Sequence, residues 1–158
     1  MCHGKEKDIT ILKELQFPHS LGLLYSAFMY YTDFKVNSGE YKLMGLAPYR
    51  NPKAEQTKEF VRKIKETLCH VCSDGSIWLD QSYFNYATGL HMIQEKKWEQ
   101  LFGVPTRKSE SPIDQVHCDL AIQQVTEEVV ILMAKEATLN RYKKFLYGWW
   151  CCSKLCSQ

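Results

Sequence analysis

The segment that most constrains the fold is residues 20–31, where apolar side chains surround the axis of the helix that their spacing predicts. These side chains are Leu21, Leu23, Leu24, Tyr25, Phe28 and Met29. A helix that is apolar all round must be covered on nearly every side. A chain of 158 residues, 45% of them hydrophobic, is long enough for one core. Whether it can cover this helix completely is left open by the sequence.

Four further elements are expected before residue 80. Residues 8–15 alternate apolar and polar side chains in their first half, which predicts a half-buried strand that enters an existing sheet. Residues 36–39 favour a turn, and a short helix then covers Glu40–Leu46 and ends before a proline. Asn51 and Pro52 have the chemistry of a helix start, and apolar residues follow at helical spacing, namely Phe60, Ile64 and Leu68.

A hairpin and a long helix complete the expected elements. Asp74 and Gly75 supply a tight turn before the β-prone residues 77–80. Ser111, Pro112 and Asp114 form a capping signature for the helix that follows. One face of that helix is apolar for about seven turns, through Ile113, Val116, Leu120, Val125, Val129, Leu132 and Met133.

Charge and composition exclude several classes of function. The 20 Lys and Arg nearly balance the 18 Asp and Glu, which argues against nucleic acid or an anionic membrane as a partner. The chain has no apolar run of a secretory signal or a membrane span, so we expect a cytoplasmic protein. An odd total of seven cysteines favours reduced thiols over a disulfide framework.

Three blocks of sequence carry a resemblance to a known family. Residues 17–49 read FPHSLGLLYSAFMYYTDFKVNSGEYKLMGLAPY, and residues 82–89 read SYFNYATG. LFGVPTR at 101–107 and DLAIQQVTEEVV at 119–130 follow in the family order. The chain resembles the amino-terminal domain of the ATP-dependent O-carbamoyltransferases that modify nodulation factors, cephalosporins and aminoglycosides.

The resemblance implies a fold, a reaction and a set of cofactors. The expected fold class is α/β, as a helix-rich fragment of an actin-like ATPase domain. The complete enzyme would use ATP and carbamoyl phosphate to make a carbamoyl-adenylate, then transfer the carbamoyl group to a hydroxyl of a small-molecule acceptor such as a sugar or an antibiotic. Iron would belong to the complete enzyme, with ligands at positions absent from this chain. The remainder of the enzyme is thus an expected partner, and we expect no turnover from this chain alone.

The domain is expected to cover residues 1–146, with an out-of-frame tail at 147–158. That tail crowds two tryptophans and three cysteines without any periodicity. Read one base later, the codons of Trp149 and Trp150 both encode glycine, and their neighbours permit the glycine-rich phosphate loop that the family has there. We therefore hypothesise a reading-frame slip near residues 138–146.

The turn and short helix supply the candidate nucleotide site, Ser38, Gly39, Glu40 and Lys42. Glycine allows close approach of backbone to a ligand, Glu40 could accept ribose hydroxyl groups, and Lys42 could face a phosphate. From the residues alone, an exposed Glu40–Lys42 pair beside a turn is the alternative. The resemblance favours nucleotide, because related tRNA-modifying ATPases place a Gly-Glu motif against it; the spacing to Lys42 differs.

Asp80 and Tyr83 are the candidate acceptor site, because a carboxylate beside phenols could bind a hydroxyl- or amino-bearing substrate. The alternative is that Tyr83 is a core aromatic and Asp80 ends a strand. His19 is expected to be a satisfied or capping imidazole rather than a catalytic group.

A second class of function stays open, a non-catalytic binding module stabilised by zinc. Cys69 and Cys72 have zinc-ligand spacing, and Cys152 with Cys156 would be the second pair. That second pair has unusual spacing and falls in the suspected tail. We therefore expect that this chain binds no metal ion.

Overall fold

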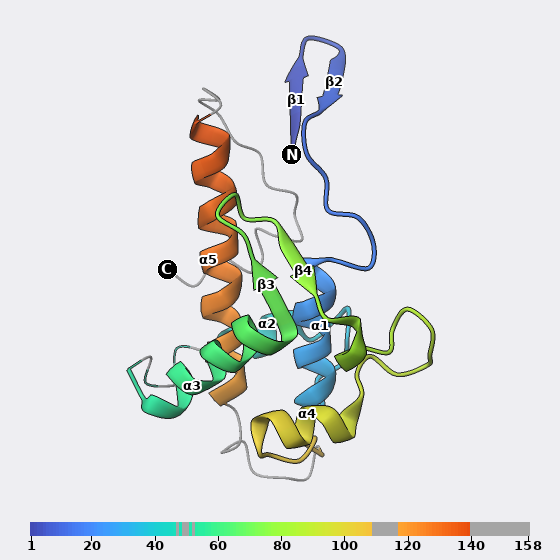
Figure 1. Ribbon diagram of the computed structural model, residues 1–158, viewed down its shortest axis with the longest axis vertical. Helices are drawn as coiled ribbons and strands as arrows, with labels where there is room; N and C mark the ends of the chain where they lie inside the picture. Colours follow the sequence, from blue (N-terminus) through green and yellow to red (C-terminus); the bar gives the residue numbers. More distant parts are fainter. Residues whose placement is uncertain (47, 49–50, 52, 109–116, 140–158) are drawn as a thin grey trace.

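The computed structural model describes residues 1–46, 48, 51, 53–108 and 117–139 (Figure 1). Its elements, in chain order, are β1 (Cys2–Lys5), β2 (Asp8–Ile11), α1 (Leu21–Tyr31), α2 (Glu40–Leu46), α3 (Glu55–Lys63), the π-helical turn η2 (Ile64–Leu68), β3 (Cys69–Val71), β4 (Ile77–Leu79), the 3₁₀ turn η3 (Gln81–Tyr83), α4 (Glu95–Phe102) and α5 (His117–Leu139). Helices are combined with two small antiparallel sheets, β1–β2 and β3–β4. The expected mixture of helix and strand is confirmed at this level.

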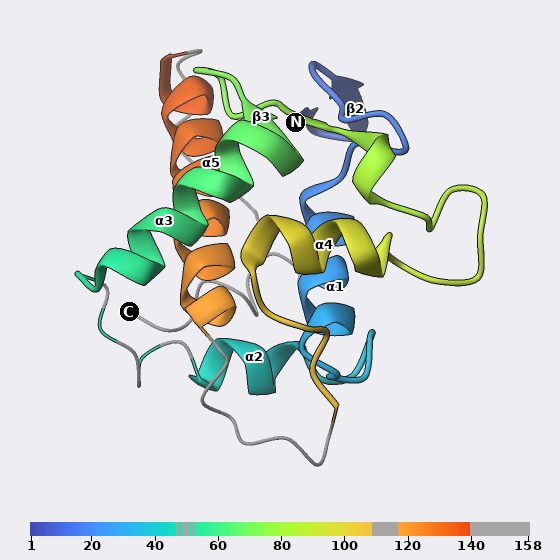
Figure 2. The same ribbon diagram turned by 60° about the horizontal axis from the view of Figure 1, so that its bottom comes forward.

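Helix α1 is the buried centre that its sequence predicts. Ser20 caps it by accepting a hydrogen bond from the backbone N–H of Leu23 at 3.4 Å. Most of its side chains are buried, among them Leu24, Tyr25 and Phe28, which have no exposed surface. Helices α2 and α5 pack against α1, and α4 lies beside it (Figure 2). Aromatic side chains of α4 contact α1. Helix α1 is therefore covered on most of its surface, as its apolar sequence requires.

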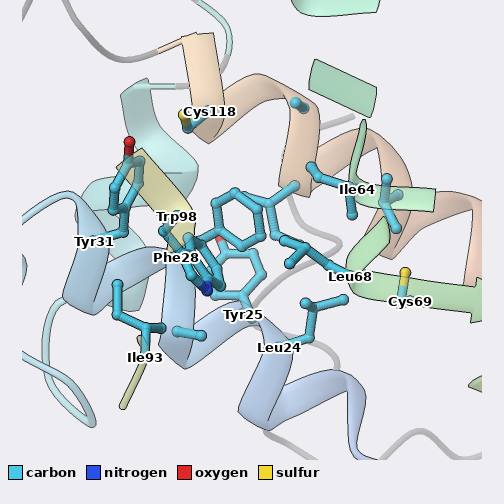
Figure 3. Close-up of a cluster of buried hydrophobic side chains, with 14 of the residues drawn as sticks. Leu24, Tyr25, Phe28, Tyr31, Ile64, Leu68, Cys69, Ile93, Trp98 and Cys118 are labelled. Carbon is cyan, nitrogen blue, oxygen red and sulfur yellow. The ribbon is translucent and has the colours of Figure 1, made fainter. Parts of the chain in front are cut away.

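An aromatic cluster joins α1 to α4 at the middle of the core. The ring of Phe28 lies 4.8 Å from the ring of Trp98 and 5.7 Å from that of Phe102, in edge-to-face geometry (Figure 3). Tyr31 lies 5.3 Å from Trp98, and Phe60 of α3 lies 5.3 Å from Phe102. Such pairs contribute about 0.5–1.5 kcal/mol each beyond the burial of their area. The cluster thus fixes how α4 sits on α1.

Helix α3 runs into η2 and packs along α5. Phe60 of α3 and the two apolar residues Ile64 and Leu68 of η2 are buried, as their spacing predicts. The predicted start of the helix was wrong, because α3 begins at Glu55 after Ala54 and not at residues 51–52. The side chain of Asn51 is used in a local turn, where its Oδ1 accepts from the N–H of Lys53 at 2.9 Å.

The predicted hairpin is present as β3 and β4, with Cys69 opposite Leu79 and Val71 opposite Ile77. Gly75 in the turn has φ +80°, the left-handed backbone that glycine permits. Alternate side chains along the strands face opposite sides of the sheet. Cys69, Ile77 and Leu79 therefore enter the core, while the cross-strand pair His70 and Trp78 lies on the outer face.

The predicted strand at the amino-terminal end is real but was wrongly placed in a larger sheet. It covers Asp8–Ile11, and its partner among the described strands is β1, with Cys2 opposite Ile11. Ile9 is 76% exposed and Ile11 is 63% exposed, so this strand is not half-buried. Alternation along the strand marks which side chains share a face, but does not show what that face contacts.

Helix α5 confirms the predicted long helix from residue 117 onwards. Leu120, Val125 and Val129 are buried, whereas Leu132 and Met133 are partly buried. The capping signature and the first apolar positions, residues 111–116, lie outside the described residues. The same holds for the suspected tail at 147–158, so the frame-slip hypothesis and the boundary at residue 146 stay predictions.

Candidate functional site

The candidate nucleotide segment forms the start of α2. The carbonyl oxygen of Gly39 accepts from the N–H of Lys42 at 2.9 Å and from that of Leu43 at 3.3 Å. A Cβ atom at Gly39 would lie 2.9 Å from the carbonyl oxygen of Lys35 and 3.3 Å from Cε of Met29. Close packing of the chain against itself therefore explains the glycine, whether or not a ligand approaches it.

Glu40 turns back towards the loop that precedes α2. Its Oε1 accepts a hydrogen bond from the backbone N–H of Asn37 at 2.9 Å. Asn37 has a left-handed backbone, with φ +69°, and this bond gives its N–H a partner. The carboxylate also lies near the phenol of Tyr25, whose pKa is raised first by burial and then by the charges of Asp119, Glu40 and Glu127. Glu40 thus stands where α1, α2 and α5 meet, with its second oxygen still able to accept a hydrogen bond.

The other members of this segment face solvent. Ser38 and Lys42 are exposed, and the Nζ atom of Lys42 lies 6.0 Å from the ring centroid of Tyr41. This lysine is therefore free to reach a phosphate beyond the surface of α2. Ser38 and Gly39 directly precede α2, and Glu40 and Lys42 lie in its first turn, so the four residues are neighbours because they are adjacent in the sequence.

Asp80 and Tyr83 flank η3, directly after β4. Asp80 is exposed, and its Oδ1 accepts from the N–H of Ser82 at 2.9 Å. The carbonyl oxygen of Tyr83 accepts from Nε1 of Trp98 at 2.9 Å, and the Nζ atom of Lys97 lies 5.4 Å from its ring centroid. Both residues have structural roles, since Asp80 caps η3 and Tyr83 anchors the core tryptophan, but Asp80 keeps acceptor capacity towards solvent.

The two candidate sites do not meet. Figure 2 places α2 at the bottom of the molecule, well apart from the β3–β4 hairpin near the top. Within the described residues, a compact small molecule could not contact both Glu40 and Asp80. Only a ligand that extends across the fold could do so. The sequence gives no signal of this separation, because each site was identified from its own segment.

A groove of about 600 Å³ beside Asp80 was missed by the sequence reading. It is lined by the outer face of the β3–β4 hairpin and by His19, which precedes α1. The ring centroids of His19 and Trp78 are 3.8 Å apart in a stacked arrangement, and Nδ1 of His19 accepts from the N–H of Leu79 at 3.0 Å. His19 is thus the satisfied imidazole that we expected, although Ser20 and not His19 caps the helix. The alternation in β4, which directs Ile77 and Leu79 inwards, is the signal that Trp78 must face outwards.

A second groove, of about 540 Å³, is lined by basic side chains of α3 and η2. Each of these cations has a carboxylate partner: Lys58 with Glu55 and Arg62 with Glu66, both at 2.6 Å, and Lys65 with Glu128 at 2.7 Å. Paired charges of this kind are weak anion binders, because a ligand must displace the carboxylate first. This groove therefore offers no ready phosphate site.

The zinc alternative gains no support from the described cysteines. Cys69 is buried in the core, and burial raises its pKa to about 12, which disfavours the thiolate that zinc requires. Within the described part of the chain, no three His, Cys, Asp or Glu side chains are grouped as metal ligands. Cys152 and Cys156 lie outside the described residues.

Comparison with known proteins identifies the family. The family model described as the carbamoyltransferase N-terminus matches residues 1–156. An uncharacterized protein, sll1178 of Synechocystis sp. (strain ATCC 27184 / PCC 6803 / Kazusa), is 55% identical over 130 residues, which are 81% of this chain and 20% of that relative. The chain belongs to the carbamoyltransferase N-terminal family. It spans about a fifth of the length of this relative. Among the described helices, none has the length and apolar character needed to cross a membrane.

Proposed function

We propose that this chain is part of an ATP-dependent O-carbamoyltransferase. The observation that carries the proposal is the family match across nearly the whole chain. In this reaction, an acceptor hydroxyl oxygen attacks the carbamoyl carbon of a carbamoyl-adenylate that was made from ATP and carbamoyl phosphate. The bond between the carbamoyl group and the phosphate of AMP breaks, and AMP leaves while the hydroxyl loses its proton. Holding the two reactants side by side lowers the barrier by positioning.

The segment of Ser38, Gly39, Glu40 and Lys42 is proposed to contact the nucleotide. The exposed side chain of Lys42 would face a phosphate, and the other carboxylate oxygen of Glu40 would accept from a ribose hydroxyl. Asp80 is proposed to contact the acceptor, because its carboxylate borders an open groove. Because the two segments lie apart, the rest of the enzyme would complete the site between them.

A chimera tests this proposal. The matched 130 residues of the Synechocystis relative are replaced by those of this chain, and release of AMP from ATP is measured with carbamoyl phosphate and a panel of sugar and amino-alcohol acceptors. We expect the chimera to form AMP as the parent relative does, and this chain alone to form none. An active parent with an inactive but folded chimera would contradict the proposed role of this chain.

A further inference from the structure

The groove between His19 and Asp80 has the features of a binding site for a cation. Its central feature is Trp78, which remains 65% exposed even though His19 stacks on its ring. The ring is therefore accessible to a ligand in the groove, and the face of an indole ring attracts cations more strongly than other aromatic rings do.

Charge around the groove also favours a cation. Asp80 and Glu66 contribute carboxylates, and among the described residues that line the groove there is no lysine or arginine. Glu66 is already paired with Arg62 at 2.6 Å, which leaves Asp80 as the available charge. Trp78 of β4 and Asp80, which follows that strand, are both exposed and both line the groove.

The imidazole of His19 fixes the aromatic surface of the groove. Its Nδ1 accepts the N–H of Leu79 at 3.0 Å, which ties the ring to the backbone of β4. The ring stacks on that of Trp78, with 3.8 Å between the centroids. The stack therefore holds the indole in place at the groove.

We propose that this groove binds the ammonium group of a cationic organic ligand, with Trp78 as the aromatic surface and Asp80 as the counter-charge. Naming that ligand as the carbamoyl acceptor rests on the proposed function, and it narrows the acceptor to an amine-bearing alcohol. Binding of the ammonium group itself does not depend on the reaction. A neutral acceptor would gain only a hydrogen bond from Asp80, and an anionic acceptor would be repelled by its charge.

Choline and its uncharged isostere 3,3-dimethylbutan-1-ol test the proposal on the full 158-residue chain. The signal is the indole N–H resonance of Trp78 in a heteronuclear NMR spectrum, assigned by its loss in W78F. Buried Trp98 serves as the internal reference for an intact fold. We expect choline to shift the Trp78 resonance with an affinity about tenfold higher than that of the isostere. The carboxylate analogue 3,3-dimethylbutanoate should bind more weakly than both.

Two charge-neutralising variants separate the site from general electrostatics. Asp80→Asn keeps an acceptor for the N–H of Ser82 but should lower choline affinity towards that of the isostere, leaving only the cation–π contribution of Trp78. Glu55→Gln removes the same charge from α3, outside the groove, and should leave choline binding unchanged. Equal affinities for choline and the isostere, or an Asp80→Asn variant that binds choline normally, would overturn the proposal.

The choline experiment and the chimera experiment test different claims, so either can fail without the other. If choline binds as expected but the chimera forms no AMP, the ammonium site stands and the proposed function fails. If the chimera is active but choline does not bind to the groove, the proposed function stands and this inference fails.

Discussion

The Nζ atom of Lys13 lies 3.2 Å from Oδ2 of Asp74, and thereby joins the segment after β2 to the turn of the β3–β4 hairpin. The same nitrogen lies 2.7 Å from Oε1 of Glu136 in α5. Three distant parts of the chain thus share one cation. Because Lys13 is 48% exposed, solvent screens these pairs and their contribution to stability is small.

The first prediction concerns the pH dependence that Asp74 creates. Hydrogen bonds from the side chain and backbone of Ser76, followed by that from Lys13, lower the pKa of Asp74 from 3.8 to about 2. Since the folded-state pKa is depressed, this carboxylate stabilises the fold above pH 3.8, and that contribution is lost as the pH falls through about 2. The free energy of unfolding of wild type should exceed that of Asp74→Asn at pH 5, with a gap that shrinks towards pH 2. A difference between the two free energies of unfolding that stays constant from pH 5 to pH 2 would contradict a depressed pKa for Asp74.

A second prediction separates backbone strain from steric clash at two glycines. Gly75 and Gly103 have φ +80° and +71°, so alanine at either position costs about 1–2 kcal/mol. A Cβ atom at Gly75 would also lie 2.6 Å from the backbone nitrogen of Met133, whereas nothing lies within 4 Å at Gly103. Gly75→Ala should therefore lower the free energy of unfolding clearly more than Gly103→Ala does, as measured by urea denaturation.

Third, the two described tryptophans should differ sharply in their importance for stability. Trp98 is fully buried in the aromatic cluster, so Trp98→Ala should cost about 3–5 kcal/mol and can unfold the chain at ambient temperature. Trp78→Ala, at an exposed position, should change the free energy of unfolding by no more than about 0.5 kcal/mol. Thermal unfolding of both variants checks the contrast, and equal losses would contradict the core described here.

Fourth, thiol reactivity should follow burial. Cys118 is fully buried and Cys69 nearly so, and burial raises the pKa of both thiols. Maleimide should therefore label the exposed Cys2 within minutes while Cys69 and Cys118 stay unlabelled until the chain is denatured. Peptide mapping by mass spectrometry identifies each site. Stoichiometric zinc, together with protection of Cys69 and Cys72 that a chelator removes, would instead favour the zinc-stabilised module.

The fifth prediction tests the proposed nucleotide contact in the chimera. Glu40→Gln keeps an acceptor for the N–H of Asn37 but removes the charge, so the fold should persist while ATP affinity falls by about tenfold. Glu55→Gln is the matched control on an exposed helix. Titration with a fluorescent ATP analogue measures both. If the two variants bind ATP equally well, Glu40 has only its structural role.

Elements set by local chemistry could be predicted from the sequence. The turn before Glu40, the Asp74–Gly75 hairpin and the all-apolar α1 each follow from neighbouring residues, and the structure has all three. Two features were not predicted, for different reasons. The start of α3 was misplaced because Asn51 takes part in a local turn that competes with a helix cap. The stack of His19 on Trp78 joins residues that are distant in the sequence and that no local pattern relates.

The candidate site shows the same division. Ser38 to Lys42 form one unit because they share a turn, but the sequence could not reveal that Glu40 also serves the backbone of Asn37. Nor could it show that Asp80 lies far from that unit and beside an open groove instead. Spatial relations between segments depend on the packing of α1, α4 and α5, which is a property of the whole core.

The β1–β2 hairpin projects from the rest of the molecule with Ile9 and Ile11 exposed (Figure 1). Strands with unpaired edges and apolar side chains recruit other strands when protein is concentrated. We therefore expect that aggregation of the purified chain at high concentration begins with association through this hairpin. Lysine in place of Ile9 would improve solubility there without disturbing the core.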